Sequence, residues 1–155
     1  MILQKASMAD VDDLIAIEAS VPKTEYYTPM VSAEKWQEEF AENNEVYLIK
    51  VDGKTVGSIA YEMKSSEHVY ISGLVVHTDY QGRGIATQAM KQILANFSDV
   101  ARIDLVTHPK NPALGLYQEL GFKIEKLVDN YWGEGKPRLV LSLTKSDENV
   151  DSLNK

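Results

Sequence analysis

Leu74-Val75-Val76-His77-Thr78-Asp79-Tyr80-Gln81-Gly82-Arg83-Gly84-Ile85-Ala86 is the most informative stretch of the chain. An apolar strand here runs into a glycine-rich turn, and the turn opens an amphipathic helix. Successive backbone N–H groups at such a turn form a cradle for an anion, and the helix N-terminus adds partial positive charge. Gly82 and Gly84 let the backbone approach phosphate oxygens, and Arg83 can add a charge-assisted bond. The stretch therefore predicts a phosphate-binding turn.

Two other interpretations of the turn stay open. A dinucleotide-binding fold would need a third glycine where the chain has Thr87, and an early strand to carry the turn. Here the turn follows a long series of strands in mid-chain, which disfavours that fold. The glycines could also serve only the geometry of a strand-to-helix connection. Gly53-Lys54-Thr55 is not a phosphate loop, because Leu48 replaces the required earlier glycine and the context is strand-turn-strand.

The rest of the chain alternates predicted strands and helices. Strands are expected at 2–5, 45–51, 55–63, 68–77, 102–107, 122–128 and 138–144, and helices at 10–19, 33–42 and 84–97. A further short helix is expected to open at Asn111-Pro112 and to end before Gly121. Asp52-Gly53 predicts a hairpin turn. This order predicts a mixed α/β (α+β) sheet in one domain over 1–145, followed by a polar tail over 146–155.

Composition narrows the classes of function. The chain has 155 residues, a formal net charge of −7 and no cysteine. The charge argues against nucleic acid as a partner and mildly favours a cationic one. The lack of cysteine rules out thiolate chemistry, and three scattered histidines argue against a metal site. No run of about 18 apolar residues and no secretory leader are present, so we expect a cytoplasmic protein without membrane contact, either a monomer or a homodimer.

Two motifs in order carry a resemblance to a known family. Gln81-Gly82-Arg83-Gly84-Ile85-Ala86 matches the Q/R-x-x-G-x-G/A signature of the GNAT acetyltransferase superfamily. The stretch 111–122, which begins with Asn111 and contains Tyr117 before Gly121-Phe122, resembles a second family segment. A helix and a strand separate the two motifs, as the family requires. The resemblance covers about residues 1–145.

The resemblance implies a fold and a cofactor. The sheet would be splayed between its fourth strand, 68–77, and its fifth, 102–108, with acetyl-CoA lying in the gap. The strand before the turn would pair with the pantetheine arm, the turn would hold the pyrophosphate, and Tyr117 would protonate the departing thiolate. The cofactor-binding residues so implied are Leu74, Val75, Val76, Gln81, Gly82, Arg83, Gly84, Ile85, Ala86, Thr87, Asn111 and Tyr117.

The general base departs from the common family pattern. Many relatives carry a glutamate on the strand before the turn, where this chain has Tyr70. Some N-terminal acetyltransferases have a tyrosine there that works through water with a histidine on the neighbouring strand. That histidine matches Val106, and His108 lies two residues further along the expected strand. We therefore expect Tyr70 and His108 to act through ordered water, with Glu62 or the amine itself as alternatives. Glu67 and His68 are expected to be solvated turn residues.

The acceptor site is implied by the same resemblance. The loop 21–31 and the hairpin at 128–137 would flank it, and Asp129-Asn130-Tyr131-Trp132 resembles a segment that holds peptides in N-terminal acetyltransferases. Its expected aromatic lining is Tyr26, Tyr27, Tyr131 and Trp132. The expected activity is acyl transfer to a primary amine of a small molecule or a peptide N-terminus. The alternatives are a non-catalytic acyl-CoA-sensing module and a purely structural domain.

Overall fold

A computed structural model describes residues 1–145, and the expected tail at 146–155 lies outside the described residues. The strands are β1 (Ile2–Lys5), β2 (Asn44–Val51), β3 (Lys54–Ser65), β4 (His68–Val76), β5 (Arg102–Thr107), β6 (Lys123–Val128) and β7 (Arg138–Thr144). The α-helices are α1 (Val11–Ala19), α2 (Ala33–Ala41), α3 (Ile85–Ala95) and α4 (Leu114–Glu119). Short 3-10 helices, η1 (Met8–Asp10) and η2 (Thr78–Tyr80), precede α1 and α3.

Local signals explain where most elements begin. Ser7 and Asp10 form a reciprocal capping box before α1, and the Ser32 hydroxyl accepts a hydrogen bond from the Lys35 amide at the start of α2. Asp52 and Gly53 both have positive φ, 51° and 78°, as the expected hairpin requires. Polar side chains next to the helix starts thus fix where η1 and α2 begin.

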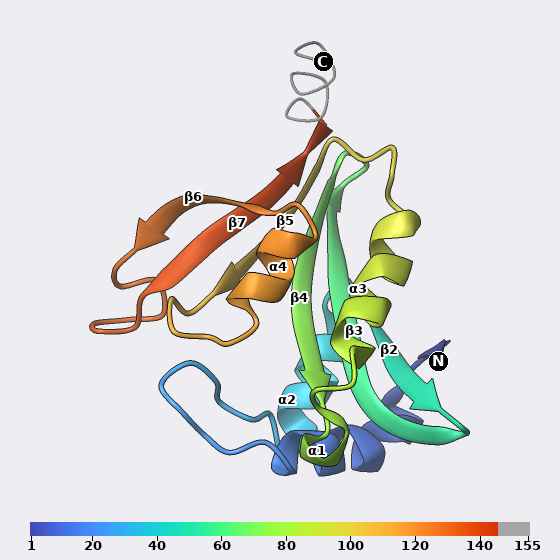
Figure 1. Cartoon of the computed structure of the whole chain (residues 1–155). Helices are drawn as coiled ribbons and strands as arrows, with labels where there is room; N and C mark the ends of the chain where they lie inside the picture. The colour runs from blue at the N-terminus through green and yellow to red at the C-terminus, as the bar shows by residue number, and fades with distance from the viewer. Residues whose placement is uncertain (146–155) are drawn as a thin grey trace.

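One sheet of seven strands runs through the described chain in the order β1-β2-β3-β4-β5-β7-β6. Neighbouring strands pair antiparallel except β4 and β5, which pair parallel. The parallel pair is short, because only His68, Val69 and Tyr70 face partners on β5 within its register. Beyond Tyr70 the two strands separate, as Figure 1 shows. The predicted mixed sheet, splayed between its fourth and fifth strands, is confirmed.

The two faces of the sheet are covered by different helices. The larger core lies on the α3 side and includes Ile59, Val69, Met90, Tyr117 and Leu141 among its buried members. The smaller core packs α1 and α2 against the other face through residues such as Leu14, Trp36 and Leu48. Full burial of a side chain of this size contributes about 1.5–3 kcal/mol, so both helical layers stabilise the sheet. Within residues 1–145, no helix is long and apolar enough to cross a membrane.

Two boundaries bear on the site: the start of the short helix differs from the prediction, whereas the end of β5 matches the expected strand at 102–107. The short helix begins at Leu114, because the Asn111 side-chain oxygen accepts a bond from the Ala113 amide at 2.9 Å and holds a turn instead. Strand β5 ends at Thr107, so His108 lies in the connection to α4 rather than on the strand. Proline at 112 and the pairing of β5 with β7, which stops at Thr107, account for these ends.

Candidate active site

The exposed edge of β4 faces the gap between β4 and β5. The His77 amide donates to the Val56 carbonyl at 2.7 Å, and the Val75 carbonyl lies against Gly57 on β3. Backbone groups alternate in direction along a strand, so those of Leu74 and Val76 point away from β3 and into the gap. The Gln81 side-chain amide donates to the Val76 carbonyl at 2.9 Å, which ties the turn to this edge. The backbone predicted to pair with an extended ligand therefore points into the gap.

The glycine-rich turn has the geometry of an anion cradle. Gly82 and Gly84 both have a backbone φ of 78°, which residues other than glycine rarely adopt. A Cβ atom at either position would meet no atom within 4 Å, so the turn is open on that side. Helix α3 begins after Gly84, and its first intrahelical bond runs from the Gln88 amide to the Gly84 carbonyl at 3.1 Å. The amides of Ile85, Ala86 and Thr87 are the donors that a helix leaves unused at its N-terminus.

Arg83 lies at the rim of this turn. Its guanidinium stacks over the Tyr80 ring, with 4.9 Å between Cζ and the ring centroid, and donates to the Asp79 carbonyl at 3.1 Å. The cation–π contact keeps the charge beside the turn. A positive charge there adds to the partial charge of the helix N-terminus, so this small region can hold an anion although the chain is acidic.

Tyr117 lies in the larger core at the base of the site. Its side chain is 8% exposed and packs edge-on against Phe122, with 6.3 Å between the ring centroids. Burial raises the pKa of Tyr117 to about 12. The hydroxyl is therefore protonated at neutral pH, as a proton donor must be. Asn111 lies one turn before α4 and uses its oxygen to hold the Ala113 amide, so its side-chain NH₂ is the group left to bind a ligand.

The loop between α1 and α2 is fastened to the elements around the gap. The Ser20 hydroxyl accepts from the Thr78 amide at 3.1 Å, next to the phosphate-binding turn. Glu25 forms an ion pair with Lys110 at 3.1 Å, in the connection between β5 and α4. Figure 1 shows this loop on the same side of the molecule as the β6–β7 hairpin. The acceptor side of the predicted site is thus formed by ordered contacts.

Glu18 is a buried carboxylate in the same region that the sequence analysis did not single out. It lies in the last turn of α1, is 5% exposed, and its Oε2 accepts from the Tyr27 hydroxyl at 2.5 Å and from the Met30 amide at 3.3 Å. Burial raises the pKa of Glu18, while the Tyr27 and Met30 bonds oppose the rise. The signal was present in the sequence, because Glu18 follows Leu14 by four residues and falls on the apolar stripe of α1.

Tyr27 connects Glu18 to the rest of the site. Burial, the charge of Glu18 and the bond to it raise the pKa of the Tyr27 hydroxyl, and Tyr117 adds to the effect. Tyr27 donates its hydroxyl proton to Glu18, whereas Tyr26 is half-buried in the same loop.

Tyr70 lies on β4 and His108 lies just beyond the end of β5, and their expected action through ordered water stays a prediction. Tyr70 lies opposite Asp104 on β5, and His108 comes four residues later, about 13 Å further along at the usual rise of a strand. The buried His108 accepts a bond at Nδ1 from the Lys110 amide at 3.0 Å. Burial, followed by Tyr131, Asp104, Glu62 and Glu39, raises the pKa of Tyr70. Tyr70 and His108 thus have different neighbours in the structure.

Tyr131 and Trp132 form an exposed aromatic pair on the β6–β7 hairpin. Their rings meet edge-on with 5.0 Å between centroids, and their exposed fractions are 39% and 57%. Tyr131 is one of the groups that raise the pKa of Tyr70 on β4, after burial. These two residues and Tyr26 are available to contact an acceptor.

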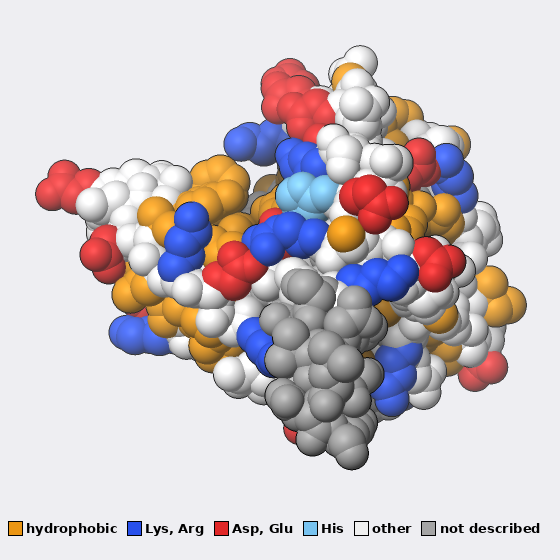
Figure 2. Space-filling model, turned by 90° about the horizontal axis from the view of Figure 1, so that it is seen from above, with side chains coloured by type: hydrophobic (Ala, Val, Ile, Leu, Met, Phe, Trp, Pro, Cys, Tyr) orange, Lys and Arg blue, Asp and Glu red, His pale blue; other side chains and the backbone are white. Residues whose placement is uncertain are grey.

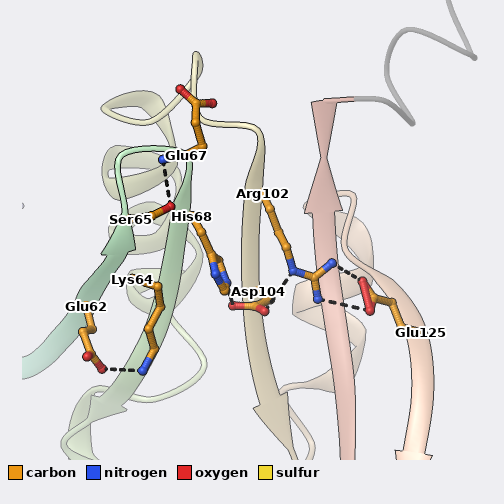
Figure 3. A network of polar contacts seen from close by, with 8 residues as sticks. All are labelled: Glu62, Lys64, Ser65, Glu67, His68, Arg102, Asp104 and Glu125. Carbon is orange, nitrogen blue, oxygen red and sulfur yellow. Dashed lines mark hydrogen bonds and ion pairs between the residues drawn. The ribbon is translucent and has the colours of Figure 1, made fainter.

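Polar contacts close the end of the gap where β4 and β5 still pair. His68 Nε2 lies 2.8 Å from Asp104 Oδ1, Arg102 Nε lies 3.1 Å from Asp104 Oδ2, and the Arg102 guanidinium makes two bonds to Glu125 (Figure 3). Glu67 accepts from the Ala101 amide at 3.2 Å. Glu67 is an exposed turn residue, as expected, whereas the expectation for His68 was wrong, because it lies half-buried on β4 and contacts Asp104. Figure 2 shows a histidine among charged side chains at this end.

The comparisons with known proteins identify the family. Residues 10–122 match the model of the acetyltransferase (GNAT) family, and the chain belongs to that family. It is 29% identical to the L-amino acid N-acetyltransferase AaaT of Escherichia coli over 66% of this chain and 69% of that protein. It is 28% identical to an uncharacterised N-acetyltransferase, MJ1530, of Methanocaldococcus jannaschii over 91% of this chain and 90% of that protein. A third relative, UPF0157 protein YqkA of Bacillus subtilis, is 35% identical over 50% of this chain, which spans 22% of its length.

Solved structures share the fold. The ribosomal-protein-S18-alanine N-acetyltransferase of Escherichia coli superposes with a TM-score of 0.77 at 18% identity, covering 92% of both chains. A GNAT acetyltransferase of Elizabethkingia anophelis with bound acetyl-CoA has a TM-score of 0.64 at 20% identity, covering 73% of this chain and 83% of the other. A spermidine N-acetyltransferase chimera from Vibrio cholerae has a TM-score of 0.75 at 18% identity, covering 95% and 98%.

Proposed function

We propose that this chain is an N-acetyltransferase that moves the acetyl group of acetyl-CoA to a primary amine of a small molecule or a peptide N-terminus. The observation that carries the proposal is the open, glycine-rich turn between β4 and α3. It offers unused amide donors at one end of a gap, and a buried tyrosine that is protonated at neutral pH lies by the same gap. A thioester with a phosphate-bearing carrier suits both features.

The binding roles follow from the directions of the groups. The amides of Gly82 to Thr87 would hold the pyrophosphate, with Arg83 adding charge from the rim. The edge of β4 at Leu74 to Val76 would bind the pantetheine arm as an added strand, since its backbone groups have no strand partner there. The Asn111 side-chain NH₂ would bind the same arm.

The chemical roles are assigned to the side chains beside the gap. Attack of an amine on a thioester needs a proton acceptor for the amine and a proton donor for the leaving thiolate. Tyr117 is proposed as the donor, because burial keeps its hydroxyl protonated. A preorganised donor of this kind typically contributes about 10²–10⁴-fold to the rate.

The acceptor class is proposed from charge and shape. The formal net charge of −7 mildly favours a substrate that carries positive charge. The aromatic pair Tyr131 and Trp132 offers flat surfaces to an ammonium or a peptide. Relatives that share the fold are named for L-amino acids, spermidine and a ribosomal protein N-terminus, which gives three starting classes for this chain.

The experiment is a release assay for free thiol with acetyl-CoA and a panel of amines. The panel holds the twenty L-amino acids, spermidine and an alanine-initiated hexapeptide, with the α-N-acetylated hexapeptide as its blocked control. Thiol release with an unblocked amine, and acetylated product by mass spectrometry, would support the proposal. Stabilisation by acetyl-CoA without thiol release across a wide panel of amines would instead favour the non-catalytic sensing module, which the tyrosine at position 70 also allows.

A further inference from the structure

Glu18 is the one buried carboxylate among residues 1–145, and the roles assigned above do not use it. A buried carboxylate is costly unless it is hydrogen-bonded, so its position on the apolar stripe of α1 needs a reason. Both of its hydrogen bonds converge on one oxygen, Oε2, which accepts from the Tyr27 hydroxyl and the Met30 amide. Anchoring the loop would explain those bonds, but an amide side chain could accept both without the cost of burying a charge.

The Glu18–Tyr27 pair lies beside the proposed chemistry. Ser20, two residues after Glu18, binds Thr78 at the phosphate-binding turn, and Glu25, two residues before Tyr27, binds Lys110 before α4. Tyr117 is among the groups that raise the pKa of Tyr27, after burial and Glu18. The loop that carries the pair is thus tied to both walls of the gap.

We infer that Glu18 is the proton acceptor of the acetyl transfer and acts through the hydroxyl of Tyr27. This inference rests on the proposed function, in which no residue has yet been assigned as the proton acceptor. As the amine nitrogen bonds to the acetyl carbon, its proton passes to the Tyr27 oxygen, and the Tyr27 proton passes to Glu18 Oε2. The carbon–sulfur bond breaks, and the thiolate takes the proton of Tyr117. The proton held by Glu18 then returns through Tyr27 to the Tyr117 oxygen, so the enzyme is restored.

The charge state of Glu18 suits this role. Burial raises the pKa of its carboxyl above the ordinary value of 4.5, which strengthens it as a base while leaving it able to ionise. The titratable groups that face the pair are Tyr27 itself and, from α4, Tyr117, with the Glu25–Lys110 ion pair at the rim.

The other elements packed against α1 carry ionisable groups of their own. Glu39 on α2 and Tyr70 on β4 both have a raised pKa, chiefly through burial, and Glu62 on β3 adds to the rise at each of them. Asp12 and Asp13 on α1 are exposed in its first turn. The inference therefore concerns the one carboxyl that Tyr27 contacts.

Glu18→Gln separates anchoring from proton transfer. Its amide oxygen can accept both bonds that converge on Oε2, so the loop stays anchored, but the side chain no longer takes up a proton. With the best amine of the panel above, we expect kcat to fall about 10²–10⁴-fold, the loss typical of a removed general base, while the melting shift with acetyl-CoA is kept. Asp13→Asn removes a carboxylate from the exposed face of the same helix and should leave kcat unchanged.

The pH profile gives a readout that a structural role would not move. In the wild type, kcat/KM with a fixed amine should show an acidic limb from Glu18 above pH 4.5, and this limb should vanish in Glu18→Gln. A kcat within twofold of the wild type, with the limb unchanged, overturns the inference. Loss of the limb in Tyr70→Phe or in His108→Asn, but not in Glu18→Gln, overturns it in favour of those residues.

A third variant tests whether the two residues form one relay. Tyr27→Phe should lower kcat as Glu18→Gln does, and the double variant should lose no more than the larger single loss, because residues acting as a unit are not additive. Fully multiplicative losses overturn the relay.

Carboxyl-labelled glutamate NMR tests the inference without any acceptor. The Glu18 resonance, identified by its absence from Glu18→Gln, should titrate above the ordinary value, and titration at or below 4.5 overturns the inference. Failure of the proposed function is distinguishable from failure of this inference. If the proposed function is wrong, the wild-type protein itself neither binds acetyl-CoA nor releases thiol, whatever the behaviour of the Glu18 variants.

Discussion

Tyr70 on β4 lies directly opposite Asp104 on β5, and theirs is the last residue pair before the two strands separate. On one side of this pair, contacts among His68, Arg102, Asp104 and Glu125 hold the strands together. On the other side, the backbone of β4 from Ile71 to Val76 has no neighbour in the sheet on its β5 side. The Tyr70–Asp104 pair therefore marks the boundary between the closed end of the sheet and the gap in which a ligand would lie.

The phosphate-binding turn can be tested with two matched glycine substitutions. Gly84 and Gly53 have the same φ of 78°, and an added Cβ would meet no atom within 4 Å at either site. Gly84→Ala and Gly53→Ala should therefore cost similar stability. Only Gly84→Ala should reduce the stabilisation by acetyl-CoA, which at 100 times Kd is about 2.7 kcal/mol. Thermal melting with and without millimolar acetyl-CoA measures both effects, and equal ligand shifts in the two variants would contradict the assignment.

Tyr117→Phe should separate catalysis from binding. The ring can stay packed against Phe122, but the hydroxyl that is protonated below a pKa of about 12 is lost. We expect kcat to fall about 10²–10⁴-fold, with the affinity for acetyl-CoA changed little. Steady-state thiol release and ligand-induced melting shifts give the two quantities. Tyr47→Phe, on β2, serves as the control, and full activity of Tyr117→Phe would reduce Tyr117 to a packing residue.

Glu18→Gln should also reveal the cost of the buried charge. The folded-state pKa of Glu18 is raised, so its protonated form stabilises the fold below pH 4.5, and this stabilisation is lost as pH rises through the folded pKa. The variant should therefore melt at a temperature equal to or above that of the wild type at pH 7, and the difference should shrink toward pH 4. Melting curves across pH 4–8 check this, and a variant that is less stable only at high pH would contradict the sign.

The ion pair at the closed end predicts the opposite dependence on pH. The hydrogen bonds of Arg102 and then of Ser142 lower the pKa of Glu125 to about 2. Its contribution is present above the ordinary value of 4.5 and is lost as pH falls toward 2. Because both side chains are about one-third exposed, Glu125→Gln should cost only about 0.2–1 kcal/mol at pH 6. Urea unfolding at pH 6, 4 and 2 measures the difference, and a cost that does not change with pH would count against the ion pair.

The aromatic hairpin should affect the acceptor and not the cofactor. Trp132 is 57% exposed, so Trp132→Ala should leave the melting temperature within about 2 °C of the wild type. If it contacts the amine, KM for the acceptor should rise about tenfold or less, as expected for one exposed aromatic contact. KM for acetyl-CoA is the internal control, and an equal rise in both constants would argue for a general loosening of the hairpin.

The sequence by itself determined the glycine-rich turn before α3, the hairpin at Asp52-Gly53 and the start of α2. Each of these depends on groups a few residues apart, such as the Ser32 hydroxyl with the Lys35 amide, or on a positive φ that glycine adopts without strain. The hydrophobic periodicity of 84–97 likewise predicts an amphipathic helix with one apolar face that packs against the sheet. The order of these elements was enough to predict a splayed mixed sheet through the resemblance to the family.

Only the tertiary structure decided which polar groups meet. His68 and Asp104 are 36 positions apart, and their contact depends on the register of the single parallel strand pair. The expected action of Tyr70 and His108 through ordered water stays a prediction, because the structure gives only their places, Tyr70 opposite Asp104 and His108 after the end of β5 at Thr107. In the sequence, Glu18 is one of several acidic residues on a predicted helix. Only the folded loop brings Tyr27 and Met30 within hydrogen-bond distance of it. The sequence names the charged groups, but burial and partners, which set their pKa values and their chemistry, arise only when distant segments pack together.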